Sequence, residues 1–278
     1  MSTVEDIIMR RSSRGMDQLR PHLAADYCRR AASSLLALKR GNVLIATGFY
    51  VGGHAETDGP PGAFFVARAL NTLGFDCTVI TDEYCAGLFQ SPASGGISEE
   101  LVDIRISGDQ LNSVLDQYNP SALISIERCG INAEGDYANM RGMSIASHTA
   151  RLDFLFEQGR RRLIPTFGIG DGGNEIGMGC FKETIERELS LSPCVTEVDF
   201  PIIASVSNWG AYGLCACLQK LSGLRVMPSS DELSRYLSHI VSMGCVDGVT
   251  GTHTPTVDGY PLAYELETIE LLRAQSNS

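Results

Sequence analysis

Short apolar, β-branched runs alternate with segments whose apolar residues recur at helical spacing along most of the chain. The apolar runs predict strands at 42–50, 77–81, 102–107, 122–127, 163–169 and 202–207. The segments between and after these runs predict helices near 61–73, 83–90, 108–118, 143–158, 174–190, 210–221, 229–242 and 260–274. Strands that alternate with helices through short connections are typical of a parallel sheet with helices packed on it. We therefore predict an α/β fold with a doubly wound, mostly parallel sheet and helices on both faces.

The first 40 residues follow a helical pattern without strands. The segment LAADYCRRAASSLLALKR places apolar residues at helical spacing and ends before Gly41, a residue type that commonly follows a helix. We predict an N-terminal helical extension over residues 1–40 and a single α/β domain over residues 41–278. The run at 102–107 alternates apolar and polar residues more than the others do, so we expect it at an edge of the sheet.

The charge of the chain narrows the classes of partner. It has 22 Lys and Arg against 33 Asp and Glu, which leaves a formal net charge of −11. A chain this acidic repels phosphate backbones and anionic lipid surfaces, so we expect neither a nucleic acid nor a membrane as partner. A small-molecule partner fits better, and a homo-oligomer is left open.

The cysteines and the N-terminus indicate the compartment. The chain has nine cysteines without a C-x-x-C pair, which predicts free thiols in a reducing environment. No apolar run approaches the ~18 residues of a membrane-spanning helix. The N-terminus has no signal-peptide core, and its early acids argue against a transit peptide. We expect a cytoplasmic protein.

Unusual residues follow several of the predicted strands, at the edge where open parallel sheets bind their ligands. After the first strand, a long loop (47–62) carries Glu56 and Asp58, and long loops in compact domains are often functional. The fourth strand is followed by Glu127 and Arg128, which could equally form a surface ion pair of little energetic weight.

Two further stretches supply weaker candidates. Asn208 follows the sixth strand and precedes the single tryptophan, a residue type that is more often core than ligand contact. The stretch DGVTGTHTPTVDG (247–259) contains Asp247 and His253, and a lone histidine is more often structural than catalytic.

The most unusual segment is GIGDGGNEIGMG, at 168–179, directly after the fifth strand. Its candidate site residues are Gly170, Asp171, Gly172, Gly173, Asn174 and Glu175. Glycines let the backbone approach a ligand closely, and a helix that begins near Asn174 would present free N–H groups to an anion. Carboxylates beside an anion site favour a divalent cation between them, whereas the simpler alternative is that Asp171 and Glu175 only cap the helix.

Common nucleotide and hydrolase motifs are absent or weak. The segment lacks the lysine of a P-loop, and its G-x-G-x-x-G match at 168–173 lies after the fifth strand and is followed by an acid. A G-x-S-x-G nucleophile motif is absent from the chain. We therefore expect no nucleotide cofactor and no hydrolase triad.

The segment GIGDGGNEIGMG, together with TGFYVGGHAETDGPPGA, IERCG and DGVTG, resembles the D-glutamate cyclase family, in its glutamate cyclase-like C-terminal domain. The resemblance covers most of the chain. It implies a lyase that converts D-glutamate to 5-oxo-D-proline with loss of water.

That reaction requires a base for the amine, a positive group or proton at the γ-carboxylate, and an acid for the departing oxygen. We assign the catalytic roles to Asp171, Glu175, Glu56 and Asp58, without deciding which acts as base and which as acid. Three of these acids, Asp171, Glu175 and Asp58, would hold a divalent cation, Mg²⁺ or Mn²⁺. Substrate carboxylates would be bound by Gly170, Gly172, Gly173 and Asn174 on one side and by Arg128, with Glu127 beside it, on the other.

Two other classes of function compete with this assignment. A non-catalytic module could bind an amino acid or anion through the same glycine-rich loops. A phosphate- or nucleotide-dependent enzyme is supported only by the expected helix start after the glycines. Nothing in the sequence reports the chirality of the substrate.

Overall fold

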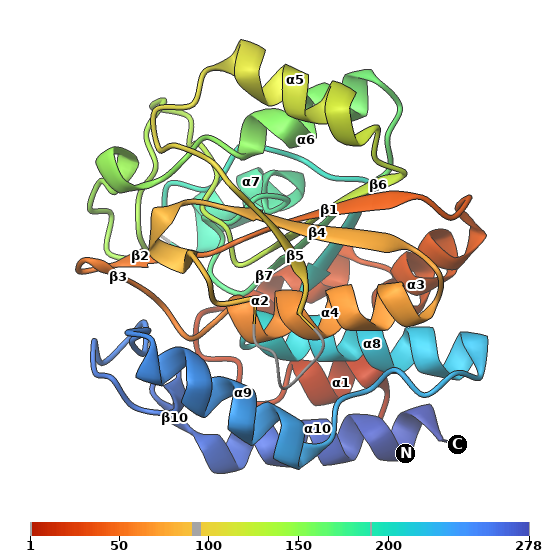
Figure 1. The fold of residues 1–278 in the computed structure, drawn as a ribbon. Coiled ribbons are helices and arrows are strands. Elements are labelled where there is room, and N and C mark those ends of the chain that lie inside the picture. Colours follow the sequence, from red (N-terminus) through yellow and green to blue (C-terminus); the bar gives the residue numbers. More distant parts are fainter. Residues whose placement is uncertain (1, 91–95, 190, 278) are drawn as a thin grey trace.

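A six-stranded, fully parallel sheet forms the centre of the computed structural model, which describes residues 2–90, 96–189 and 191–277 (Figure 1). Its strands are β1 (Asn42–Thr47), β4 (Asp76–Thr81), β5 (Ser98–Leu101), β6 (Ala122–Ile126), β7 (Thr166–Gly170) and β8 (Phe200–Ile203). Their order in the sheet is β5-β4-β1-β6-β7-β8, and all neighbours pair in parallel. The chain therefore winds outward in both directions from β1 and β6, which confirms the predicted doubly wound α/β fold.

Helices cover both faces of the sheet, as predicted. Val43 and Ile45 of β1 belong to the larger hydrophobic core, while Leu44 and Ala46 belong to the smaller one on the opposite face. Because successive strand residues point to opposite faces, this division means that β1 is buried on both sides. The larger core includes α3 (Tyr27–Ala37), α4 (Pro60–Thr72) and α8 (Ser207–Ser222), and the smaller core includes α5 (Gly108–Tyr118) and α6 (Asp153–Arg161).

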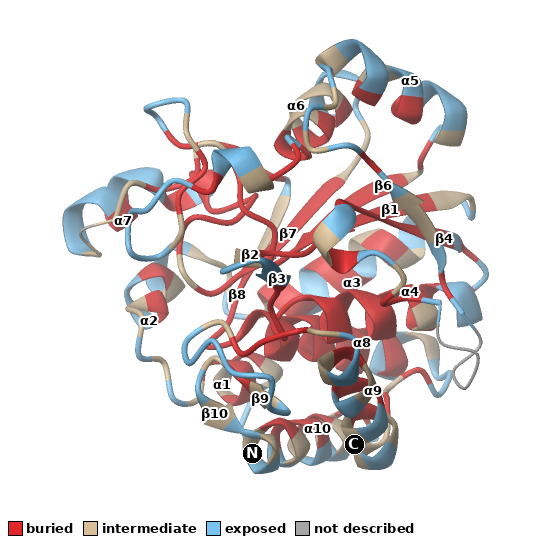
Figure 2. Ribbon diagram, turned by 60° about the vertical axis from the view of Figure 1, so that its left-hand side comes forward, coloured by how far each residue is buried: buried red, intermediate tan, exposed pale blue. Residues whose placement is uncertain are grey.

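Two further helices form an outer layer over α4 and α8. These are α9 (Ser230–Ser242) and α10 (Leu262–Ser276), which lie beyond α4 and α8 as seen from the sheet (Figure 1). The central helix α8 is consequently buried almost throughout, whereas the outer helices show alternating buried and exposed residues (Figure 2). An apolar helix without a polar face is expected only in such a position.

The N-terminal segment is helical, although in separate short pieces. It forms α1 (Val4–Ile8), α2 (Met16–Leu19), a 3-10 turn at Arg20–His22 and then α3. Ile8 of α1 packs so closely on Gly213 of α8 that a Cβ there would lie 2.9 Å from a methyl carbon of Ile8. The loop between α1 and α2 continues to the carboxyl edge of the sheet, where it contributes to the site described below.

Several predicted elements are wrong in position or type. The edge strand is β5 at 98–101 rather than 102–107, because Ser107 begins the capping box of α5 and the residues before it form a turn. The segment 83–90 contains only a 3-10 turn at Glu83–Cys85, and the helix predicted at 143–158 begins at Asp153.

The helix predicted at 174–190 begins only with α7 (Lys182–Glu188), after a 3-10 turn at Gly179–Phe181. The residues before it instead pair with other loops, through isolated bridges from Glu175 to Cys129 and from Gly177 to Glu197. Helices near 61–73, 108–118, 210–221, 229–242 and 260–274 are confirmed as α4, α5, α8, α9 and α10.

Two small antiparallel hairpins extend from the carboxyl edge of the sheet. The first, β2 (Tyr50–Val51) with β3 (His54–Ala55), lies within the loop after β1, and the second pairs β9 (Thr256–Val257) with β10 (Tyr260–Pro261). All nine cysteines are free, as predicted, and Cys180 alone is exposed. Among the described helices, none combines the length and the apolar character that a bilayer crossing requires.

Candidate active site

Acidic side chains from distant parts of the chain meet at the carboxyl ends of β1, β6 and β7, where the winding direction of the sheet reverses. They surround a small cavity of ≈ 30 Å³, well below the roughly 300–1,000 Å³ of ordinary ligand pockets. Its described lining residues are Arg14, Phe49, Glu56, Glu127, Met140, Gly172, Asn174, Glu175, Gly248 and Asp258. The expected convergence of Glu56 and Glu175 on one site is thus observed.

The loop after β1 places Asp58 at the start of α8. Its Oδ1 accepts hydrogen bonds from the backbone N–H groups of Gly59 (2.9 Å) and Asn208 (2.8 Å), and its Oδ2 accepts one from Ser207 (2.9 Å). Asn208 reciprocates, because its Oδ1 accepts from the N–H groups of Gly59 and Gly62 at the start of α4. The start of α8 is therefore capped by Asp58 from the loop before α4, and the start of α4 by Asn208 of α8, so both side chains are held rigidly.

The glycine-rich loop after β7 binds a carboxylate of its own chain. Glu175 Oε1 accepts a hydrogen bond from Gly172 N (2.7 Å), and its Oε2 accepts one from Gly173 N (2.7 Å). A Cβ at Gly170 would lie 2.7 Å from Glu175 Oε2, so that glycine leaves room for the side chain. The N–H groups predicted to receive a substrate anion are taken up by Glu175, while Asn174 Nδ2 donates to Ala138 O.

The outer glycines of the same segment allow backbones to pack closely. A Cβ at Gly168 would lie 2.6 Å from the carbonyl oxygen of Ile176, and one at Gly179 would lie 2.5 Å from that of Val195. Gly173 and Gly177 both have φ of +106°, a conformation that other residues rarely adopt. Much of the glycine content therefore folds the chain back over β7 and positions Glu175.

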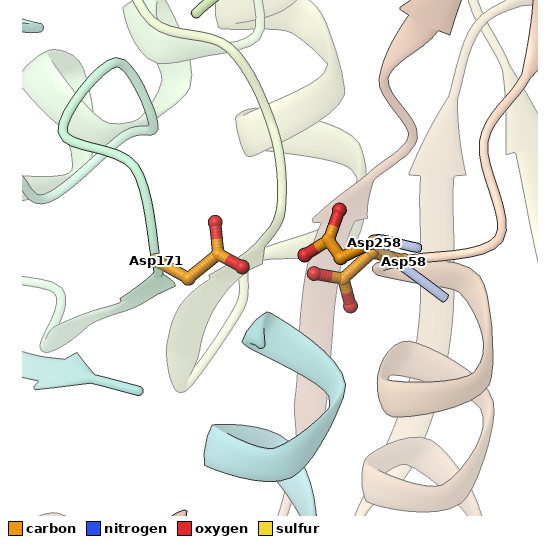
Figure 3. Close-up of side chains that lie close together, drawn as sticks. All are labelled: Asp58, Asp171 and Asp258. Atoms are coloured by element: carbon orange, nitrogen blue, oxygen red, sulfur yellow. The ribbon is translucent and has the colours of Figure 1, made fainter. Parts of the chain in front are cut away.

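Three aspartates from three loops face one another beside the cavity (Figure 3). Asp58, Asp171 and Asp258 each offer a carboxylate oxygen, and these oxygens all lie within 4.8 Å of one another. Asp171 is shared with a second such group, which contains Glu127 and Glu175. The Oδ2 atoms of Asp171 and Asp258 are buried without a hydrogen-bond partner, which indicates that a proton or a cation is needed between them.

A partly buried arginine that the sequence analysis did not select, Arg14, joins two of these aspartates. Arg14 Nη1 donates to Asp171 Oδ1 and its Nη2 to Asp258 Oδ1, both at 2.7 Å. Burial alone would lower the pKa of Arg14, but Asp171 and Asp258 outweigh it and keep the guanidinium charged. The neighbouring Arg10 and Arg11 instead pair with Glu267 at the surface.

Burial dominates the protonation of the acids around the cavity. It raises the pKa of Glu56, Asp58, Glu127 and Asp258 well above their ordinary values, and neighbouring carboxylates raise them further. The pKa of Asp171 rises only to about 7, because burial is opposed by the charge of Arg14. Acids that outnumber their cation so clearly retain protons or bind a further cation.

Glu127 and Asp258 also have strained backbones. Their φ angles are +44° and +54°, in the left-handed region that disfavours residues with a Cβ. Glu127 Oε2 accepts a hydrogen bond from Ser207 Oγ at 2.5 Å. Strained residues of this kind concentrate at active sites, where surrounding contacts hold them in place.

Other candidates lie outside the cavity lining. Arg128 is buried, forms an ion pair with Asp82 (2.6 Å) and donates to the carbonyl oxygens of Gly48 and Ala150. It thus connects loops at the β1 and β4 ends rather than facing the cavity. Asp247 accepts hydrogen bonds from backbone N–H groups of its own loop, including that of Gly259, and thereby positions Asp258. His253 lies against His54, with its Nδ1 3.2 Å from Cys245 O.

A further buried acid, which does not line the cavity, is Glu265 of α10. Its carboxylate accepts a hydrogen bond from the indole N–H of Trp209. Burial raises its pKa from 4.5 to about 8, and Trp209 opposes this shift only in part. Between these two pH values the folded state binds more protons than the unfolded state, so stability falls as pH rises and levels off above about 8. Glu265→Gln is expected to remove this component, worth up to roughly 5 kcal/mol.

The test compares urea midpoints of both proteins at pH 5 and pH 9. Because Trp209 is the single tryptophan, its fluorescence should also titrate near pH 8 in the wild type and not in the variant. Glu267→Gln, on the same helix but at the surface, is the matched control. If the urea midpoint changed with pH equally in the wild type and in Glu265→Gln, the raised pKa assigned to Glu265 would be contradicted.

Together, the fold and the site define a doubly wound α/β protein with a buried carboxylate cluster at the switch point of its sheet. A family model described as D-glutamate cyclase-like, C-terminal, matches residues 4–273, and the chain belongs to this family. This confirms the resemblance drawn from the glycine-rich segment and the loops around it.

Comparisons with individual proteins add one relative and two distant folds. The chain is 30% identical over 294 residues to the human protein named D-glutamate cyclase, mitochondrial, covering 90% of this chain and 47% of the relative. It thus spans about half the length of that relative. The Bordetella bronchiseptica enzyme WbmG, solved with NAD and UDP, matches at 10% identity and a TM-score of 0.32 over 74% of this chain and 61% of its own. The E. coli tRNA N6-threonylcarbamoyladenosine dehydratase, solved with AMP, matches at 12% identity and a TM-score of 0.31, over 76% and 94% respectively.

Proposed function

We propose that this protein is a lyase that cyclises D-glutamate to 5-oxo-D-proline with loss of water, acting in the cytoplasm. The family and the name of the human relative supply the reaction class. The observation that carries the proposal is the cluster of buried acids in unequal environments around Arg14, at the edge of the sheet where ligands of such folds bind.

Acids in unequal environments suit a reaction that needs both a base and an acid. The substrate's ammonium group must lose a proton before its nitrogen attacks the γ-carboxyl carbon. Asp171, with a pKa of about 7, is suited to accept that proton near neutral pH. Glu56 and Glu127, whose pKa values are raised by burial, each retain a proton, and the departing oxygen takes up two protons to leave as water. The nitrogen gives up its second proton to one of the acids thus ionised as the lactam forms.

The rigid supports of these acids serve the ring closure by position. Glu175 is held by the glycine loop and Asp58 by the start of α8, so neither can swing away when a substrate enters. A substrate bent between such fixed groups brings its nitrogen close to its own γ-carbon, and positioning of this kind lowers a barrier substantially.

The aspartate cluster also fits a divalent cation, Mg²⁺ or Mn²⁺. Its donors are all carboxylate oxygens, the ligands that these hard cations prefer, and the partnerless Oδ2 atoms of Asp171 and Asp258 are the available ones. A cation bound there would neutralise the γ-carboxylate and make its carbon more electrophilic. Glu175, assigned to the cation from sequence, has its oxygens engaged by backbone N–H groups and belongs to the adjoining group of acids.

The decisive experiment incubates the protein with a panel of D- and L-amino acids and follows lactam formation by NMR. D-glutamate is expected to give 5-oxoproline, with activity lost in EDTA and restored by Mg²⁺ or Mn²⁺. Absence of lactam from every substrate, with and without added metal, would reject the proposal. Binding of D-glutamate by calorimetry without turnover would instead support a non-catalytic amino-acid-binding module.

A further inference from the structure

Recognition of an anionic substrate is a problem in a site so rich in acids. The side chains around the cavity include Glu56, Glu127, Glu175 and Asp258, with Asp171 directly behind. A dicarboxylate would be repelled by any of these in ionised form. Among the described residues that line the cavity, Arg14 is the one basic side chain. The chemistry therefore requires that Arg14 takes part in binding an anion, or that another cation does so alone.

We propose that Arg14 is the specificity-determining residue of the site: it leaves its aspartate partners and binds the α-carboxylate of the incoming amino acid. This inference rests on the proposed function, and it assigns to Arg14 the role that the sequence analysis gave to Arg128. The guanidinium of Arg128 is already held by Asp82 and two backbone carbonyls, away from the cavity lining.

The position of Arg14 supports an exchange of partners. Its two terminal nitrogens each bind a different aspartate, one from the β7 loop and one from the β9–β10 hairpin. The two terminal nitrogens of a guanidinium that bind two carboxylates can instead bind both oxygens of a single carboxylate, which is the preferred geometry of arginine with this group. The substrate's α-carboxylate would thus replace Asp171 and Asp258 without leaving the guanidinium unpaired.

The size of the cavity gives an independent reason for movement. A volume of ≈ 30 Å³ is about a tenth of the roughly 300 Å³ of the smallest ordinary ligand pockets and is too small for a five-carbon amino acid. Arg14 is itself part of the lining, with 19% of its side chain exposed, so its rotation enlarges the space directly. The backbone of this segment can stay in place while the Arg14 side chain rotates, because Tyr260 OH donates to Arg11 O at 2.9 Å and anchors it.

The test uses D-glutamate and D-isoglutamine, in which the α-carboxylate is replaced by a neutral amide. Wild type should prefer D-glutamate. Arg14→Gln should raise KM for D-glutamate about 10- to 100-fold, as expected for the loss of charge-assisted hydrogen bonds, and leave KM for D-isoglutamine nearly unchanged. Arg14→Lys should recover part of the preference. Arg10→Gln should match the wild type, because Arg10 pairs with Glu267 and is not among the described residues that line the cavity.

A readout without turnover separates this inference from the proposed reaction. Glutarate, which keeps both carboxylates but cannot cyclise, should bind the wild type by calorimetry and bind Arg14→Gln at least 10-fold more weakly. If glutarate binding depends on Arg14 while D-glutamate gives no lactam, the reaction is wrong and the recognition role stands. Equal loss for D-glutamate and D-isoglutamine, or a failure of wild type to bind glutarate, overturns the role of Arg14. Should Arg14→Gln not fold, as judged by circular dichroism, Arg14→Lys carries the same comparisons.

Discussion

Asp171→Asn is expected to lower lactam formation from D-glutamate by at least about 10³-fold while the fold remains intact. General acid–base catalysis contributes roughly 10²- to 10⁴-fold, and an amide of the same shape cannot accept the proton and, being uncharged, binds a divalent cation more weakly. Asp171 belongs to both groups of acids at the site, so its loss removes the base or, where a cation is bound, one of the ligands of that cation. The measurement is kcat by NMR or coupled assay, with circular dichroism as the check on folding.

Asp116→Asn provides a matched control for this substitution. Its carboxylate is 70% exposed and pairs with Arg162 on the outer face of α5, so its activity should equal that of the wild type. If Asp171→Asn retained more than a tenth of the wild-type rate, Asp171 would not be the base and a neighbouring acid would have to be tested in its place.

Gly168→Ala is expected to reduce the free energy of unfolding by about 3 kcal/mol, since overpacking against immobile atoms has costs of this order. The added Cβ would lie 2.6 Å from the carbonyl oxygen of Ile176 and 3.0 Å from the Cα of Gly177. Both belong to backbone that is itself tied to Arg128 and Thr196 by hydrogen bonds, so it cannot retreat without breaking them. Urea denaturation, read as a shift of the midpoint at constant slope, measures the loss.

Gly96→Ala is the corresponding control, because a Cβ at that exposed position meets open space. Its free energy of unfolding should lie within about 0.5 kcal/mol of that of the wild type. A wild-type midpoint for Gly168→Ala would mean that the glycines of this segment serve a ligand rather than the packing of the chain on itself.

The architecture could be predicted from the sequence because local patterns determine it. Runs such as 43–46 and 122–126 are almost entirely apolar, as expected of strands buried on both faces, and helical periodicity marks α5 and α9. Predicted elements were wrong where the local pattern of apolar and polar residues was ambiguous. The alternation at 102–107 reads as a strand, yet Ser107 and Gln110 form a capping box that ends the turn there and begins α5.

The residues of the candidate site likewise divide into those that local sequence patterns could select and those that they could not. Glu56, Asp58, Asp171 and Glu175 could be selected because they follow strands whose carboxyl ends share one edge. Arg14 could not, because it follows no strand and lies in a segment that is 157 residues from Asp171 in the chain. Asp258 was not selected because it lies in the turn of a short hairpin, β9–β10, that was not among the predicted strands.

By itself the sequence determined the fold class, the family and the set of loops from which the acids come, because residue type and spacing carry that information. Only the tertiary structure decided which partner each charged group has. Glu175 is bound by its own loop, Arg128 by Asp82, and Arg14 by Asp171 and Asp258. The physical reason is that a charge buried in the protein is compensated by whichever groups lie within a few ångströms, and that distance is set by the packing of remote segments.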